Sequence, residues 1–318
     1  MGVCKGKIVV ALGGNALQRK GAPATAQAQL EVVRDTCRHL ARLSLGGYEI
    51  AIVHGNGPQV GRIEQAFETA AKEIPPMPFD VCDAMSQGYI GYHLQLGMKE
   101  ALNQVGLGRI PVVSLVTQVL VDRDDPAFEH PSKPVGSFYG PQEAELLSRQ
   151  RGYTMKEDAG RGWRRVVPSP LPREILEFET IKRLWDSTIV ITCGGGGIPV
   201  VRGENGLLEG IAAVIDKDYA AELLARQIEA DVLMILTEVR EAAIYFGTPQ
   251  QQNLHHLTTQ QAKTYAAQGQ FAAGSMLPKI QAAIRFVEST PGRKAIITSL
   301  DNALPAMEGQ GGTVISNP

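Results

Sequence analysis

The sequence has little cysteine, no excess of charge of one sign and no long apolar run. Its 318 residues include four widely spaced cysteines, Cys4, Cys37, Cys82 and Cys193, with no C-x-x-C pair. This spacing predicts neither a zinc site nor a disulfide framework. The formal net charge of -2 argues against a nucleic-acid-binding surface. No apolar stretch approaches the ~18 residues of a membrane helix, and the N-terminus lacks the apolar core of a signal peptide. We therefore expect a soluble, cytoplasmic protein without membrane or nucleic-acid partners.

Several catalytic motifs are also missing. The sequence contains no G-x-x-x-x-G-K-[ST], H-E-x-x-H or G-x-S-x-G, which excludes a P-loop and removes support for hydrolase chemistry. Residues 55–61 read G-x-G-x-x-x-G, which departs from the dinucleotide-binding spacing. His54 ends a predicted strand, and His255 and His256 stand in a polar stretch. The histidines therefore form no triad or metal pattern, and we predict no metal ligands from the protein.

Strand-like and helix-like segments alternate along most of the chain, which predicts an α/β fold with a mostly parallel sheet. Expected strands are 7–12, 49–54, 189–193, 232–236, 242–246, 294–298 and an edge strand at 313–316, with 110–121 too long for one strand. Expected helices are one spanning Leu30 to Leu40, then 62–74, 84–105, 174–186, one beginning near 217, 259–268, 276–287 and 302–307. A proline-rich stretch at 122–166 breaks this alternation. We expect a single domain over 1–318, in which residues 122–166 are an inserted subdomain that overhangs the main sheet.

Three of the predicted strands end in glycine-rich turns. The turns are Gly13-Gly14-Asn15, Gly55-Asn56-Gly57 and Gly194–Gly197. Ligands of open α/β sheets bind beyond the carboxyl ends of the strands, and glycine lets backbone N–H groups approach an anion closely. Each turn alone is ordinary turn chemistry, but together the three favour one anion-binding site.

Two lysines stand where a helix dipole disfavours a cation. Lys217 lies in the first turn of a predicted helix, and Lys279 follows Ser275, a good N-cap, and Pro278. Either they are solvated surface lysines or an anion is held between them. A phosphoryl group in transfer fits the second interpretation, because its charge is spread over three oxygens. Asp218 either organises these lysines or is simply an acid at a helix N-terminus.

Seven motifs together carry a resemblance to a known family. They are Ala11–Asn15, His54–Gly61, Pro131–Gly136, Lys156–Trp163, Gly194–Pro199, Ala213–Asp218 and Gly274–Lys279, in this order along residues 7–316. The sequence closely resembles the carbamate kinases, within the amino-acid kinase superfamily. The resemblance implies an α/β/α sandwich on a mainly parallel sheet of about eight strands, a protruding subdomain and a homodimer. It also implies reversible phosphoryl transfer between carbamoyl phosphate and ADP, giving ATP and carbamate, with Mg²⁺ carried by the nucleotide.

The resemblance also assigns roles to individual residues. Lys217 and Lys279 would stabilise the transferred phosphoryl group, Asp218 would organise them, and Lys133 would reach carbamoyl phosphate from the subdomain. The residues expected around carbamoyl phosphate are Gly13, Gly14, Asn15, Gly55, Asn56, Gly57, Gly195, Gly196 and Arg161. The residues expected around the nucleotide are Thr237, Tyr245, Ser275, Met276 and Lys279.

The sequence departs from the family pattern after Thr237. Many relatives continue Thr-x-Val-Asp, whereas this chain has Arg240 followed by Glu241. Two alternatives to a carbamate kinase therefore stay open. One is a kinase of the same fold acting on another acyl phosphate, on a carboxylate such as acetylglutamate or on a phosphonate, against which the motifs around Lys133 and Arg161 argue. The other is a non-catalytic nucleotide or phosphate sensor.

Overall fold

The molecule is built on one large twisted sheet. The computed structural model describes residues 4–19, 21–158 and 160–317. The eight strands lie in the order β15-β17-β16-β12-β1-β2-β9-β3, and only the β16–β17 pair is antiparallel. Their bounds are β1 Gly6–Leu12, β2 Tyr48–His54, β3 Val112–Ser114, β9 Ile189–Thr192, β12 Val232–Thr237, β15 His256–Thr258, β16 Lys294–Ser299 and β17 Thr313–Ser316. The predicted α/β fold with a mainly parallel sheet of about eight strands is confirmed.

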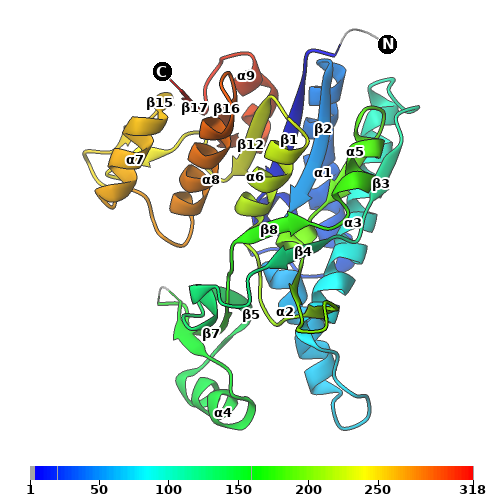
Figure 1. Ribbon diagram of the computed structural model, residues 1–318, viewed down its shortest axis with the longest axis vertical. Coiled ribbons are helices and arrows are strands. Elements are labelled where there is room, and N and C mark those ends of the chain that lie inside the picture. Colours follow the sequence, from blue (N-terminus) through cyan, green and yellow to red (C-terminus); the bar gives the residue numbers. More distant parts are fainter. Residues whose placement is uncertain (1–3, 20, 159, 318) are drawn as a thin grey trace.

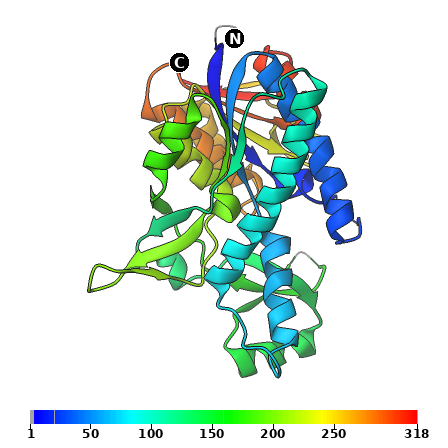
Figure 2. The ribbon, with the colours of Figure 1, turned by 90° about the vertical axis from the view of Figure 1, so that its right-hand side faces the viewer.

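Helices cover both faces of this sheet (Figures 1 and 2). One layer holds α1 Ala26–Leu45, α3 Phe79–Gln104 and α9 Ala303–Met307; the other holds α5 Phe178–Trp185, α6 Lys217–Gln227, α7 Thr259–Ala267 and α8 Met276–Ser289. In β1, Ile8 and Val10 pack in the first layer, whereas Val9 and Ala11 pack in the second. A strand buried on both faces must be apolar at every position, which explains its continuous apolar run.

Three smaller sheets surround the large one. The strand order β11-β10-β4-β8 forms one sheet, β13-β14 another and β5-β7-β6 the third. Their bounds are β4 Gln118–Val121, β5 Lys133–Tyr139, β6 Met155–Glu157, β7 Trp163–Val167, β8 Pro172–Ile175, β10 Ile198–Arg202, β11 Leu208–Gly210, β13 Ala243–Ile244 and β14 Gln252–Asn253. Short 3-10 helices are η1 Gly14–Ala16, η2 Pro126–Phe128, η3 Gly194–Gly196 and η4 Leu300–Asn302.

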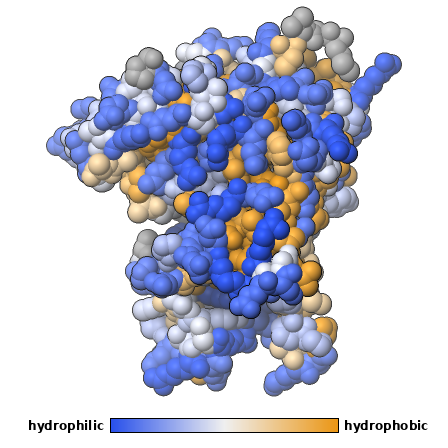
Figure 3. Space-filling model, in the orientation of Figure 1, coloured by the Kyte–Doolittle hydropathy of each residue, from blue (hydrophilic) through white to orange (hydrophobic). Residues whose placement is uncertain are grey.

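Residues 133–167, with β5, β6, β7 and helix α4 Pro141–Arg151, form what we call the lower lobe. It hangs below the main sheet in Figure 1, and the surface is indented between the two in Figure 3. The lobe packs on helix α2 Gly57–Thr69, where a Cβ atom at Gly61 would lie 2.1 Å from Cα of Gly136. An ion pair between Arg165 and Glu64 supports the same contact. The start of β5 is therefore held beside the N-terminus of α2.

Several predicted boundaries are wrong. The helix expected at 174–186 begins only at Phe178, because residues 172–175 pair with β4 as strand β8. The strand at 313–316 is not an edge strand, since β15 continues the sheet beyond it. His256 therefore begins a strand, although its polar surroundings predicted a loop. Helices α2 and α3 begin five residues earlier than expected, at Gly57 and Phe79.

Other predicted elements are confirmed. The 110–121 segment, expected to be too long for one strand, divides into β3 and β4. Within the described residues, no helix has both the length and the apolar content that a membrane crossing requires.

Candidate active site

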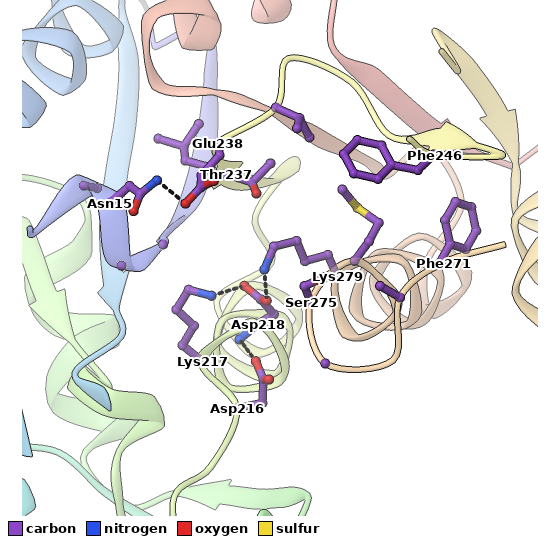
Figure 4. A pocket seen from close by; sticks show the side chains of 18 of the residues that line it. Asn15, Asp216, Lys217, Asp218, Thr237, Glu238, Phe246, Phe271, Ser275 and Lys279 are labelled. Carbon is purple, nitrogen blue, oxygen red and sulfur yellow. Dashed lines mark hydrogen bonds and ion pairs between the residues drawn. The ribbon is translucent and has the colours of Figure 1, made fainter. Parts of the chain in front are cut away.

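A cavity of 620 Å³ opens at the carboxyl ends of the central strands β1 and β12. Leu236 and Thr237 of β12 and Gly13 after β1 form part of its wall, and Leu300 after β16 closes one side. The first turns of α6 and α8 contribute further lining residues, among them Lys217, Asp218 and Lys279 (Figure 4). This is the edge of a parallel sheet where ligands bind in open α/β folds.

A buried aspartate joins two lysines from different helices at the floor of this cavity. Asp218 Oδ1 lies 2.9 Å from Lys217 Nζ, and Asp218 Oδ2 lies 2.8 Å from Lys279 Nζ. Figure 4 shows both lysine side chains turned toward this carboxylate. Burial alone would raise the pKa of Asp218, but the two ammoniums outweigh it and hold the pKa below its usual value. Asp218 therefore stays ionised and fixes the spacing of the two cations.

The two lysines differ in how well their charge is compensated. Burial lowers the pKa of Lys217, but Asp218 and Asp216 outweigh it and raise the pKa above the ordinary value. Burial and the neighbouring Lys217 lower the pKa of Lys279 below the ordinary value. A third lysine, Lys133 of β5, lies 2.6 Å from Asp216. Three ammoniums against two carboxylates leave positive charge, so the cluster favours an anion.

The three glycine turns do not contribute equally. Gly13, Gly14 and Asn15 line the cavity. Gly55, Asn56 and Gly57 are not among the lining residues. Gly55 lies behind Lys217, since a Cβ atom at Gly55 would be 3.3 Å from Lys217 Cδ.

Gly195 and Gly196 are buried and stand apart from the cavity wall. A Cβ atom at Gly195 would lie 2.3 Å from Asn56 Nδ2, and its φ of 71° also favours glycine. This turn therefore supports the second glycine turn from behind rather than facing a ligand.

The other end of the cavity is mainly apolar. Phe246, Phe271 and Met276 line it, together with Ala243 and Ala272. In Figure 4, Phe246 and Phe271 lie on the side away from Lys217. An apolar slot beside a cationic floor fits a ligand with a flat ring at one end and phosphates at the other.

Comparisons with known proteins agree with this geometry. The sequence profile described as "Amino acid kinase family" matches residues 6–299. The chain belongs to the amino acid kinase family. Its relatives include a carbamate kinase of Clostridium perfringens, 51% identical, with 97% of this chain and 99% of the relative covered. The carbamate kinase-like protein YqeA of Escherichia coli is 52% identical, with 97% and 98% covered.

A solved structure leads to the same family. The carbamate kinase from Giardia lamblia bound to AMP-PNP superposes with a TM-score of 0.91 at 43% identity, covering 98% of this chain and 99% of that one. The resemblance to carbamate kinases, drawn above from seven motifs, is confirmed.

Not every residue that the family resemblance indicated lies at the cavity. Arg161 pairs with Asp158 at 2.8 Å and stacks over Phe138 at 5.0 Å. In the β5–β7 ladder, Lys133 pairs with Val167 at one end and Tyr139 pairs with Trp163 at the other. Arg161 comes just before Trp163 in the chain, so it lies near the end of the ladder that is far from Lys133. Six residues of strand span ~20 Å. Arg161 is thus remote from the cavity, and the neighbouring Ala159 lies outside the described residues.

The expected nucleotide residues divide in a similar way. Thr237, Ser275, Met276 and Lys279 line the cavity of this amino acid kinase, but Tyr245 does not. Its neighbour Phe246 faces the cavity instead. Ser275 stands at the N-cap of α8 as predicted, yet its hydroxyl makes no capping hydrogen bond.

Four of the cavity residues that sequence reasoning missed have an evident role in the site. Asp216 caps α6 and binds Lys133, Glu238 accepts a hydrogen bond from Asn15, and the aromatic rings of Phe246 and Phe271 form the apolar wall. The Asp-Lys-Asp spacing at 216–218 was a usable signal for Asp216. The two phenylalanines carried no such signal, because nothing local distinguishes them from core residues.

The departure from the family pattern after Thr237 affects the cavity only partly. Glu238, Val239 and Glu241 line it, whereas Arg240 donates a hydrogen bond of 2.7 Å to Asn302. Glu241 also lies 2.9 Å from His255. The unusual Arg240 is therefore accommodated beside η4, outside the cavity wall.

Proposed function

We propose that this protein is a carbamate kinase that transfers a phosphoryl group between carbamoyl phosphate and ADP. The observation that supports this most directly is the convergence of Lys217 and Lys279 on one buried carboxylate at the cavity floor. A cation pair held at fixed spacing is suited to a charge that is spread over phosphoryl oxygens. In the direction of ATP formation, the bond from phosphorus to the carbamate oxygen breaks as the bond to a β-phosphate oxygen of ADP forms.

The residues around the cluster have separate tasks in this scheme. The ammoniums of Lys217 and Lys279 neutralise the phosphoryl oxygens, and Asp218 keeps both oriented before the substrate arrives. The turn at Gly13, Gly14 and Asn15 lies on the wall of the same cavity, where its backbone can approach an acyl phosphate closely. Because the transferred group passes in line between two held substrates, positioning and charge neutralisation suffice, and no covalent enzyme intermediate is needed.

Mg²⁺ would enter with the nucleotide phosphates and supply further positive charge to the transferred group. Glu238 and Asn15 offer oxygen atoms at the cavity, of the type that Mg²⁺ prefers. Among residues 4–19, 21–158 and 160–317, no three His, Cys, Asp or Glu side chains are grouped to hold a metal. The side chains present thus suit an ion held mainly by phosphate and water.

We also propose that residues 122–166 form a subdomain over the carbamoyl phosphate site, within a single domain spanning 1–318. Lys133 at the start of β5 supports this, because it lines the cavity while the rest of the lower lobe extends away. The lobe would thus deliver a third ammonium to the acyl phosphate.

ATP formation from ADP and a set of acyl phosphates tests the proposed function. We expect ATP from carbamoyl phosphate and much less from acetyl phosphate or acetylglutamyl phosphate. The opposite preference would indicate another kinase of the same fold. ADP binding by calorimetry without ATP from any acyl phosphate would indicate a nucleotide sensor instead.

We propose a homodimer as the working form of the protein. Helix α3 carries four exposed apolar side chains at spacings of four, seven and four residues, namely Val81, Met85, Tyr92 and Leu96. This spacing places them on one stripe of the helix. A second copy of the chain would cover that stripe. Light scattering after chromatography should give a dimer for the wild type and a monomer for Met85→Glu/Tyr92→Glu; an unchanged dimer would place the interface elsewhere.

A cytoplasmic location is proposed as well. Cys37, Cys82 and Cys193 are buried free thiols, as expected of a protein kept in a reducing compartment. Activity recovered in the soluble cytoplasmic fraction of cells would support this location, and activity in a secreted fraction would contradict it.

A further inference from the structure

Asp216 joins two parts of the molecule that are far apart in the sequence. Its Oδ1 accepts a hydrogen bond of 2.9 Å from the backbone N–H of Asp218, which makes it the N-cap of α6. Its Oδ2 accepts a hydrogen bond of 2.6 Å from Nζ of Lys133, at the start of the lower lobe. Only 12% of the Asp216 side chain is exposed, and the residue lines the cavity.

We propose that Asp216 is a positioning residue that ties the lower lobe to helix α6, and so holds Lys133 beside Lys217 and Lys279. One oxygen orders the first turn of the helix that carries Lys217 and Asp218, while the other sets the place of the third ammonium. This inference rests on the proposed function, because it concerns how the same site holds carbamoyl phosphate.

Holding the flexible side chain of Lys133 in one place has an entropic cost that a fixed partner can offset. A lysine side chain loses up to ~2 kcal/mol of rotamer entropy when it is fixed in one place. Among the residues that the structure describes, Asp216 is the acidic side chain within ion-pairing distance of Lys133. The lobe itself is anchored on α2 through the ion pair between Arg165 and Glu64. Asp216 therefore fixes the cavity end of a lobe whose other contacts lie on α2.

Electrostatics alone predicts the opposite role for this residue. A carboxylate at an anion site repels the anion, so removing its charge should strengthen phosphate binding. If Asp216 positions Lys133, removing the charge should weaken binding instead, because the ammonium is no longer held toward the substrate. The two interpretations thus differ in the sign of the effect on KM for carbamoyl phosphate.

The variant Asp216→Asn separates these effects. Asparagine is as good an N-cap as aspartate, so α6 keeps its cap while the charged partner of Lys133 is lost. We expect KM for carbamoyl phosphate to rise ~10-fold or more, as the loss of a charged hydrogen bond implies, with the Kd for ADP and the Tm little changed. Asp125→Asn is the matched control, because Asp125 caps η2 and is not among the residues lining the cavity. A lower or unchanged KM in Asp216→Asn would overturn the inference.

A double-mutant cycle with Lys133→Met tests whether Asp216 acts through Lys133. If Asp216 acts through Lys133, then Asp216→Asn should raise KM in the wild type and have almost no further effect in Lys133→Met. Independent, multiplying effects of the two substitutions would contradict the proposed coupling.

A third measurement needs no turnover. The rate at which Lys133 is acylated by acetic anhydride, followed by mass spectrometry, should rise in Asp216→Asn while that of the exposed Lys263 stays constant. An unchanged acylation rate at Lys133 would contradict the proposal that Asp216 holds this side chain in place. If the wild type formed no ATP from carbamoyl phosphate, the proposed function would fail, whereas this labelling would still decide whether Asp216 holds Lys133.

Discussion

The two ends of the cavity are built on different physical principles. At the charged end, Lys133, Lys217 and Lys279 are each already paired with an aspartate before any ligand binds. At the apolar end, the rings of Phe246 and Phe271 make no fixed polar contacts; Phe271 is packed in the core, whereas Phe246 is 66% exposed. The charged end is thus organised in advance, whereas at the apolar end Phe246 is covered only when a ligand binds.

This difference suits the two tasks of a kinase. The charge that develops in the transition state is stabilised best by groups that are already in place, because reorganisation of the site during the reaction would slow it. Recognition of a flat ring needs apolar area and tolerates some movement. Loss of a residue at the charged end should therefore lower turnover, while loss at the apolar end should mainly weaken binding.

The largest expected effect is at the two lysines bound to Asp218. Lys217→Ala or Lys279→Ala should each lower kcat by about 10²–10⁴-fold, since a preorganised charge contact to the transferred group is lost. Lys263→Ala, an exposed lysine of α7, is the control and should retain full activity. Near-normal turnover in both site variants would contradict the roles assigned to the charged end.

A smaller effect is expected at the apolar end. Phe246→Ala should raise KM for ADP by about 3–30-fold with kcat nearly constant, because a ring worth ~1–2 kcal/mol of apolar contact is removed. Tyr245→Ala is the matched control, since this neighbouring ring does not line the cavity. A larger effect at Tyr245 than at Phe246 would restore the assignment made from the family resemblance.

A buried carboxyl group beside the second glycine turn has no cationic partner among the groups that shift its pKa. Asp83 of α3 is 1% exposed and accepts a hydrogen bond from Asn56 of the second glycine turn. Burial raises the pKa of Asp83 from 3.8 to about 8. A raised carboxyl pKa means that its contribution to stability is complete below pH ~4 and is lost as the pH rises through 8.

Asp83→Asn should therefore stabilise the protein in alkaline solution. The amide keeps an acceptor for Asn56 but has no charge to bury. The Tm of the variant should exceed that of the wild type by about 2–4 °C at pH 9, with the difference vanishing near pH 4. Glu73→Gln, at an exposed carboxylate outside α3, serves as the control in these thermal scans. A difference independent of pH would mean that Asp83 is not a buried titrating group.

The smallest effect is expected at Arg161. Arg161→Ala should leave KM and kcat for carbamoyl phosphate within about twofold, because the side chain is paired with Asp158 at the far end of the lower lobe. A tenfold rise in KM would show that the lobe brings Arg161 to the substrate during turnover.

Prediction from the sequence succeeded for elements whose type follows from residues that are close together in the chain. The strand expected at 7–12 is β1, and the helix expected to begin near 217 is α6, which starts at Lys217. Prediction missed the strand at 256–258, and it therefore wrongly placed the correctly predicted strand 313–316 at the edge of the sheet. The segment 256–258 becomes a strand because it pairs with a neighbouring strand, and a segment of three residues is too short to show that pairing in its own sequence.

For the site, local sequence patterns were enough to indicate the chemical groups: the lysines at helix starts, the aspartate between them and the glycines after strands. Which of these groups meet depends on the tertiary fold. It brought Lys279 and Lys133 to aspartates 61 and 83 residues away, and it placed Gly195 behind Asn56. The physical reason is that helix and turn signals act over a few residues, whereas an ion pair between distant segments depends on how whole layers pack. Spacing along the chain does not encode that packing.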